Sequence, residues 1–171
     1  MKTKQPRIGL DIDEVLAGFM KAYYKYFDVA RHPERLENHA ITRNVQQVLS
    51  KDRDFWLNLE VINRIDFVPE LYCTKRVCNK EWTRRWLIMN GFPDRPIYQL
   101  FNQSGNKGKV LKGRVDIFID DSFSNVKNCR AAGIQSLLLH NEFNADIPLF
   151  KLYSLDYESI METINFMSIE W

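Results

Sequence analysis

Near its start the chain reads Ile8-Gly9-Leu10-Asp11-Ile12-Asp13-Glu14-Val15-Leu16. A short apolar run that turns directly into acids is typical of a strand that is buried on both faces and ends in a polar loop. Such strands belong to parallel sheets that carry helices on both sides. These residues therefore predict an α/β fold whose first strand, at residues 7–12, brings Asp11 and Asp13 to its carboxyl end.

Strand and helix patterns alternate through most of the remaining chain. Short apolar runs predict the strands, and apolar residues three and four positions apart predict the helices. The alternation indicates a Rossmann-like parallel sheet covered by helices on both faces. Further strands are expected at 70–74, 97–101, 115–119 and 134–139, helices at 79–90, 106–112 and 124–132, a loop at 102–105, and a loop followed by a helix within 146–171.

The helix at 79–90 has signals at both ends. Asn79 is a candidate N-cap, whose side chain would accept a hydrogen bond from the first turn. Gly91 suits the left-handed turn that follows a helix, and Pro93 prevents the helix from continuing. The face that we expect to be buried contains Trp82, Trp86, Leu87 and Met89.

Residues 16–66 do not follow this alternation. A helical pattern at 15–27 is followed by a polar segment with short helical pieces. We expect a small helical cap at 16–66, inserted after the first strand, with residues 1–15 and 67–171 forming the α/β core domain. The aromatic residues of the cap either stack on a substrate or form the cap's own hydrophobic core. They are Phe19, Tyr23, Phe55 and Trp56.

Composition excludes several classes of protein. The 171 residues suit one domain with a small insertion, and 45% hydrophobic residues indicate a folded globule. A net charge of +2 predicts no nucleic-acid polymer as a partner. Three cysteines without a CxxC spacing predict neither disulfides nor zinc. Without an apolar signal or membrane segment, the expectation is a soluble cytoplasmic protein, whose oligomeric state the sequence does not indicate.

Polar residues stand where four apolar runs end or are followed by a loop. Asp11 and Asp13 follow the first strand, Thr74 ends the second, and the Asp120-Asp121 pair follows the run at 115–119, while Lys107 lies beyond the third. Because parallel strands end at one edge of the sheet, we expect these groups to converge on one crevice. Clustered carboxylates repel one another unless a cation lies among them, and hard oxygen ligands select magnesium.

This set of residues suits phosphoryl transfer. A carboxylate such as Asp11 can attack phosphorus, and an acid two residues on, Asp13, can protonate the leaving oxygen and then activate water. The Thr74 hydroxyl and the Lys107 ammonium can stabilise charge on the phosphoryl group. Each residue alone has a plain structural role, as a cap, a turn or a solvated lysine. Their conjunction at successive strand ends favours catalysis.

The same residues resemble the four motifs of haloacid dehalogenase-like (HAD) phosphatases. Ile8–Leu16 is similar to the first motif, DxDxV/T, and Leu71-Tyr72-Cys73-Thr74 to the second. Lys107 looks like the lysine of the third motif, and Asp116–Asp121 resembles the fourth, with its paired acids. The resemblance implies a magnesium-dependent phosphomonoester hydrolase that forms an aspartyl-phosphate.

The resemblance also implies a role for each matching residue. Asp11 would be nucleophile and metal ligand, and Asp13 would be general acid/base, with its backbone carbonyl on the metal. Thr74 and the Lys75 amide would hold the phosphoryl oxygens. A lysine would steady the nucleophile; Lys107 is favoured because it opens the helix, with Lys109 and Lys112 as alternatives. The metal would be bound by Asp121, and Asp120 would support it directly or through water.

A closer resemblance is to the 5'(3')-deoxyribonucleotidase branch, through Thr83–Pro93, Ile119–Ser122, and Ala132-Gly133-Ile134 with Asn144 downstream. It implies a deoxynucleoside monophosphate as the small-molecule substrate. Phe19, Phe55 and Trp56 would then face the nucleobase, and Arg76 a phosphate or ribose. The chain departs from the branch between the cap and the second strand, where only Leu59 to Glu70 is available.

Rival functions fit these residues less well. A phosphoacceptor receiver has its acid pair first, whereas here the pair comes last, and a dehalogenase does not need Asp13. A non-catalytic phosphate-binding module would tolerate loss of either Asp11 or Asp13, and both are present. A phosphatase for a non-nucleotide metabolite stays open, and motifs alone do not separate a hydrolase from a phosphomutase.

Overall fold

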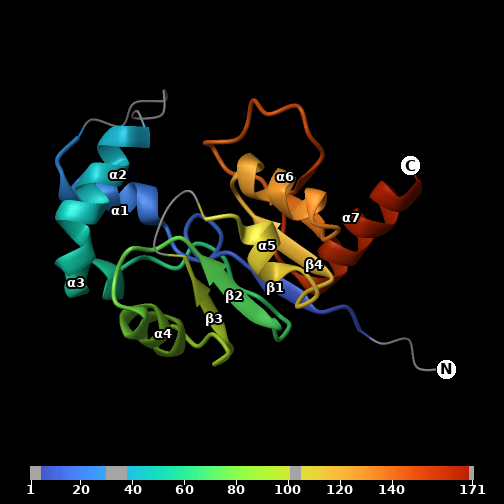
Figure 1. Ribbon diagram of the computed structural model, residues 1–171, viewed down its shortest axis with the longest axis horizontal. Coiled ribbons are helices and arrows are strands. Elements are labelled where there is room, and N and C mark those ends of the chain that lie inside the picture. The colour runs from blue at the N-terminus through green and yellow to red at the C-terminus, as the bar shows by residue number, and fades with distance from the viewer. Residues whose placement is uncertain (1–4, 30–37, 101–104, 170–171) are drawn as a thin grey trace.

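The computed structural model describes residues 5–29, 38–100 and 105–169. In these ranges six parallel strands form one sheet in the order β3-β2-β1-β4-β5-β6 (Figure 1). The predicted α/β fold with a parallel sheet is therefore confirmed. The strands are β1 (Ile8–Leu10), β2 (Leu71–Thr74), β3 (Ile97–Gln99), β4 (Ile117–Asp120), β5 (Gln135–Leu139) and β6 (Lys151–Leu152).

Helices cover both faces of this sheet, as the alternation of elements predicts. Two helices, α4 (Lys80–Met89) and α7 (Tyr157–Ile169), pack on one face, and α5 (Lys107–Leu111) and α6 (Phe123–Ala131) pack on the other. Figure 1 shows α5 and α6 side by side. Among the described residues, no helix is both long and apolar enough to cross a lipid bilayer.

Alternation along the strands separates two hydrophobic clusters. Tyr72 belongs to the cluster under α4 and α7, whereas its neighbours Leu71 and Cys73 belong to the cluster under α5 and α6. Ile117 and Phe118 divide in the same way. Because successive side chains of a strand point to opposite faces, an apolar run without polar gaps is needed where both faces are covered.

The cap helices lie on one side of the molecule, away from α6 and α7 (Figure 1). The described elements are α1 (Phe19–Tyr26), α2 (Asn38–Gln47), the 3₁₀ helix η1 (Leu49–Lys51) and α3 (Arg53–Leu57). The segment that enters the cap, at residues 16–18, is hydrogen-bonded to the segment that leaves it, at residues 60–62. The Gly18 amide donates to the Glu60 carbonyl at 2.9 Å, and the Ile62 amide donates to the Leu16 carbonyl at 2.9 Å. Residues 30–37 of the expected cap lie outside the described residues.

Several predicted boundaries differ from the observed ones. Asn79 does cap α4, accepting from the Glu81 amide, and Gly91 follows the helix at φ +79°. Met89, however, is 60% exposed, and Thr83 is buried on the inner face in its place. The first cap helix begins at 19 rather than 15, because residues 14–16 form a turn between the bridged residues Asp13 and Ala17. Phe101 of the third strand and residues 102–104 of the expected loop lie outside the described residues.

Candidate active site

The candidate site lies where β1 and β4 end next to each other. From this point the sheet continues through β2 on one side and through β5 on the other, and such a switch leaves a crevice at the carboxyl ends of the strands. A cavity of about 270 Å³ opens there. Larger hollows lie elsewhere among the described residues: one of about 370 Å³ between β5 and α7 has no carboxylate in its lining, and those of about 380 and 490 Å³ have carboxylates but lie away from the strand ends where Asp11, Asp13 and Asp121 border one cavity with Lys107. The chemistry of the lining therefore identifies the site.

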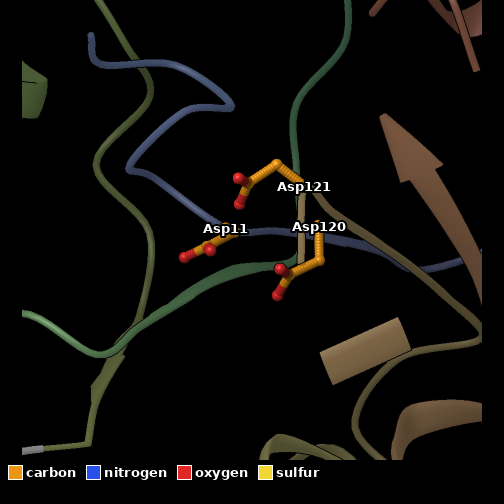
Figure 2. A group of neighbouring side chains, drawn as sticks. All are labelled: Asp11, Asp120 and Asp121. Carbon is orange, nitrogen blue, oxygen red and sulfur yellow. The ribbon is translucent and has the colours of Figure 1, made fainter. Parts of the chain in front are cut away.

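Three carboxylates meet at this point. Asp11 follows β1, Asp120 ends β4, and Asp121 comes next. The Asp11 amide donates to the Ile119 carbonyl at 2.9 Å, so the strand pairing itself brings these acids together. One oxygen from each side chain lies within 4.8 Å of the others. Figure 2 shows the three side chains next to one another. Asp11 and Asp121 line the cavity, while Asp120 is completely buried beside it.

Lys107 is the basic residue of this cluster. Its Nζ lies 2.8 Å from Asp11 Oδ2 and 2.8 Å from Asp120 Oδ2, and its side chain is buried. Burial opposes the positive charge, but Asp11 and Asp120 outweigh burial and raise the pKa of Lys107. Of the three lysines considered from the sequence, Lys107 lies in the site, whereas Lys109 and Lys112 are exposed on the surface.

The cluster has more negative charge than Lys107 alone can balance. Burial raises the pKa of Asp11 to about 7, and Asp120 adds to the rise while Lys107 opposes it. The pKa of Asp121 is raised well above its ordinary value, by burial first and then by Asp120 and Asp11. A cation between these oxygens would favour their ionised forms, so the donor set fits a hard divalent metal such as magnesium.

The oxygens of Asp120 are largely occupied by other partners. Its Oδ1 accepts from the Ser122 amide at 2.9 Å and from Asn125 Nδ2 at 3.1 Å, and its Oδ2 accepts from Lys107. Asp121 Oδ2 has a longer contact, 3.2 Å, with Asn141 Nδ2. A metal would therefore find an open oxygen on Asp121 more readily than on Asp120. Asp11 lines the cavity, but its Oδ1 accepts from the Ile12 amide at 2.8 Å and its Oδ2 lies 2.8 Å from Lys107 Nζ.

Asp13 lines the same cavity but has a different partner. The guanidinium of Arg76 donates to its carboxylate, with Nη2 at 2.7 Å and Nε at 3.0 Å from Oδ1. Arg76 is 1% exposed, so its side chain is directed to Asp13 inside the protein rather than to the open cavity. The sequence places Arg76 among the substrate-binding residues; the structure has it behind Asp13.

The second strand contributes a hydroxyl and a lysine. Thr74 ends β2, is 1% exposed, and its Oγ1 accepts from the Arg76 amide at 3.3 Å. Thr74 and Lys75 both line the cavity. Burial lowers the pKa of Lys75, and nearby Lys107 adds to this effect. In the sheet, β2 and β4 lie on opposite sides of β1. Thr74 and Lys75 therefore come from one side of Asp11, and Asp121 comes from the other.

The cap aromatics divide between the cavity and the cap interior. Phe19 lines the cavity, together with Met20 and Ile41 of the cap. Phe55 and Trp56 are buried and pack against Phe19, with ring centroids 5.9 and 5.7 Å from its ring. Phe55 and Trp56, together with the buried Tyr23, therefore form an aromatic interior behind Phe19, which is the alternative that the sequence left open for such residues.

Further polar and aromatic residues border the site without having been singled out from sequence. Asn125 lies in α6 and its Nδ2 donates to Asp120 Oδ1, while Asn125 Oδ1 has no partner among the described residues. Glu14 has φ +59° and accepts from the Met20 amide at 2.7 Å, and burial raises its pKa to about 7. Asn141 and Phe143 come from the loop after β5, whose course no local pattern reveals.

Comparison with known proteins identifies the fold. No family model matches the sequence, and no curated protein matches it. Among solved structures, the chain is similar to the HAD-hydrolase YfnB from Bacillus subtilis, described in a magnesium-bound form, with a TM-score of 0.54 over 95% of this chain and 100% of that one. Sequence identity is 14%, so the likeness concerns the fold alone. The chain thus has the fold of the HAD hydrolases, with an acid cluster at the carboxyl ends of its strands.

Proposed function

We propose that the chain is a magnesium-dependent phosphomonoester hydrolase that forms an aspartyl-phosphate on Asp11. The observation that carries the proposal is that two carboxylates in DxD spacing, a third carboxylate, a threonine and a buried lysine border one cavity. The HAD-hydrolase fold, and the magnesium bound by the similar protein YfnB, support the same reaction class.

In the first step an Asp11 oxygen would attack phosphorus while the ester P–O bond breaks. Asp13 would give its proton to the leaving oxygen, so that an alcohol rather than an alkoxide departs. The Thr74 hydroxyl and the Lys75 amide would hold two phosphoryl oxygens, and Lys107 would stabilise the charge beside Asp11. Magnesium, held by Asp11, Asp121 and the backbone carbonyl of Asp13, would neutralise a phosphoryl oxygen.

In the second step Asp13 would take a proton from water while the water oxygen attacks phosphorus. The bond between phosphorus and Asp11 would break, which releases inorganic phosphate and restores the Asp11 carboxylate. Asp13 would end the cycle protonated, ready for the next ester. Asp120 would take no part in bond making, and would keep Lys107 in place through the 2.8 Å contact.

For the substrate we propose a small phosphate ester with an apolar face, of which a deoxynucleoside monophosphate is the favoured example. Phe19, Met20 and Ile41 from the cap and Phe143 from the core form the apolar part of the cavity wall. A planar nucleobase suits such a wall, since aromatic rings stack favourably. A phosphorylated non-nucleotide metabolite is the alternative.

The experiment that tests this proposal measures phosphate release from a panel of esters, with magnesium and with chelator. The panel contains deoxy- and ribonucleoside 5'- and 3'-monophosphates, sugar phosphates and an aryl phosphate. We expect magnesium-dependent release, fastest with deoxynucleotides. Release only from other esters would support the assignment as a phosphomonoester hydrolase and exclude the assignment as a nucleotidase. Binding without release from any ester would instead support a phosphate-binding module.

A further inference from the structure

The pairing of Arg76 with Asp13 has a consequence for the reaction. A buried guanidinium is always charged and needs hydrogen-bond acceptors close by. Arg76 has such an acceptor in Asp13 Oδ1, at 2.7 Å, and its side chain is fully shielded from solvent. Asp13 itself keeps 23% of its side chain exposed and lines the cavity. One member of the pair is therefore interior, and the other reaches the site.

Two tryptophans hold the guanidinium in place. Its carbon lies 5.1 Å from the ring centroid of Trp56 in the cap and 5.3 Å from that of Trp86 in the core, distances at which a cation is attracted to the ring. Both indoles are themselves fixed, because Trp56 Nε1 donates to the Leu49 carbonyl at 2.7 Å and Trp86 Nε1 donates to that of Leu59 at 2.9 Å.

The two oxygens of Asp13 are not equally engaged by Arg76. Oδ1 accepts from Nη2 at 2.7 Å and from Nε at 3.0 Å, whereas Oδ2 has only a share of the Nε proton, at 3.1 Å. A carboxyl group held mainly by one oxygen in a fixed fork has a fixed plane, and the less engaged oxygen keeps a lone pair for a proton.

We propose that Arg76 is a positioning residue that grips Asp13 by Oδ1, so that Oδ2 exchanges its proton with the leaving oxygen and later with water. This inference rests on the proposed hydrolase function. In the forward step the Oδ2–H bond breaks as the leaving oxygen gains the proton and its bond to phosphorus breaks. Arg76 keeps its own protons throughout and does not touch the substrate.

The test exploits the leaving group. An alkyl phosphate needs a proton on its departing oxygen, whereas 2,4-dinitrophenyl phosphate releases a stable anion and does not. For Arg76→Met we expect kcat/KM, which reports the steps up to release of the leaving group, to fall about 100-fold for the best alkyl ester, the low end for acid–base catalysis, and to change by less than about threefold for the aryl ester. Arg76→Lys, which keeps the charge but loses the fork, should show the same pattern more weakly.

A control variant and a double variant show whether Arg76 acts through Asp13. Arg84→Met, on the exposed side of α4, is the matched control and should leave both rates unchanged. If Arg76 acts through Asp13, the double variant Asp13→Asn/Arg76→Met should be no slower on the alkyl ester than Asp13→Asn alone. A double variant that multiplies the two losses would overturn the inference, because Arg76 would then act separately.

An equal loss of kcat/KM with both esters would also overturn the inference, since a general structural role does not distinguish leaving groups. Thermal unfolding of each variant shows whether it is folded, and Arg76→Lys carries the comparison if Arg76→Met does not fold. If the unmodified protein hydrolyses neither ester, the proposed function itself fails, and that outcome is distinct from a loss confined to the Arg76 variants.

Discussion

Asp11 and Asp13 are two residues apart and have different surroundings. Asp11 is buried among acids, with Lys107 at 2.8 Å, while Asp13 is gripped by the guanidinium of Arg76. Two carboxylates in unlike environments can carry two roles in one reaction, as nucleophile and as acid/base. The division follows from the strand, because the backbone at Asp11 still pairs with β4, whereas Asp13 stands in the turn beyond.

The first prediction concerns the nucleophile. Asp11→Asn removes the charged oxygen that would attack phosphorus but keeps the size of the side chain. We expect turnover to disappear while the thermal unfolding midpoint stays at or above that of the unmodified protein, because the variant removes one of several repelling carboxylates. Steady-state phosphate release and circular dichroism measure the two quantities. An active Asp11→Asn protein would exclude Asp11 as nucleophile.

The second prediction separates the lysines. Lys107→Met should lose most activity, because without the buried ammonium the pKa of Asp11 would rise further and less of the charged carboxylate would be present to attack phosphorus. Lys109→Met, two residues away on the same helix and exposed, should retain the unmodified rate. Phosphate release from the preferred ester, measured at saturating magnesium, gives the comparison. Equal rates in the two variants would show that Lys107 has no role in catalysis.

At the scale of elements, α5 is placed by its contact with α6. A Cβ at Gly108 would stand 2.2 Å from the Asn128 carbonyl oxygen, so the two helices approach closely only because this residue is glycine. The contact is next to Lys107 and fixes where its side chain starts. Close packing of two short helices thus sets the position of the buried lysine.

The third prediction tests this close approach. Helix propensity alone says that Gly108→Ala stabilises α5 by up to about 1 kcal/mol. The added Cβ would clash with the backbone carbonyl of Asn128, and backbone can shift only at a cost in packing. We therefore expect the free energy of unfolding to fall by about 1–3 kcal/mol instead. Urea unfolding measures it, with Lys109→Ala on the exposed side of the same helix as control. An unchanged or higher stability would contradict the geometry.

The fourth prediction concerns the start of α7. Asp156 accepts hydrogen bonds from the Ser159 amide at 2.8 Å and from the hydroxyls of Ser154 and Ser159, and these bonds, the Ser154 hydroxyl first, lower its pKa to about 2. A lowered pKa stabilises the fold above the unfolded value of 3.8, and the contribution is lost as the pH falls through about 2.

Asp156→Ala should therefore lower the free energy of unfolding by about 1 kcal/mol at neutral pH, the usual value of an N-cap. The difference from the unmodified protein should shrink as the pH falls from about 4 to about 2. Chemical denaturation across this range measures it, with the exposed Asp146→Ala as control. A difference that grows toward low pH would refute the assigned cap.

Much of this element structure follows from local pattern. Asn79 and Gly91 signal the ends of α4, and apolar runs signal β1, β2 and β4, because burial on both faces demands continuous apolar sequence. Strand β6 was not predicted, since two residues carry no periodicity. The partner of Asp13 was not predicted either, because Arg76 is positioned by Trp56 and Trp86, which come from separate parts of the chain.

At the scale of the whole molecule, one parallel sheet gathers the site. The residues predicted at strand ends, Asp11, Thr74 and Asp120, converge because all strands run the same way and end at one edge. The cap supplies the rest of the cavity through Phe19, Met20 and Ile41. Residues from the loop after β5 also border the cavity, and they could not be assigned in advance, since a loop's path depends on the completed fold.

The fifth prediction concerns the metal and global stability. A cation bound to the folded acid cluster, and not to the unfolded chain, stabilises the protein by mass action, by about 2.7 kcal/mol at one hundred times Kd. Magnesium added to chelator-treated protein should thus raise the thermal unfolding midpoint. The rise should be largely lost in Asp121→Asn and kept in Asp146→Asn. A rise that is equal in both variants would mean that magnesium binds elsewhere.

The most direct test of the central claim is chemical trapping of the intermediate. Borohydride reduces an aspartyl-phosphate to homoserine, so protein quenched during turnover with magnesium and substrate can be digested and analysed by mass spectrometry. The account predicts homoserine at position 11, absent without substrate and absent in chelator. Steady turnover without homoserine at position 11, or with the modification at another carboxylate, would contradict it.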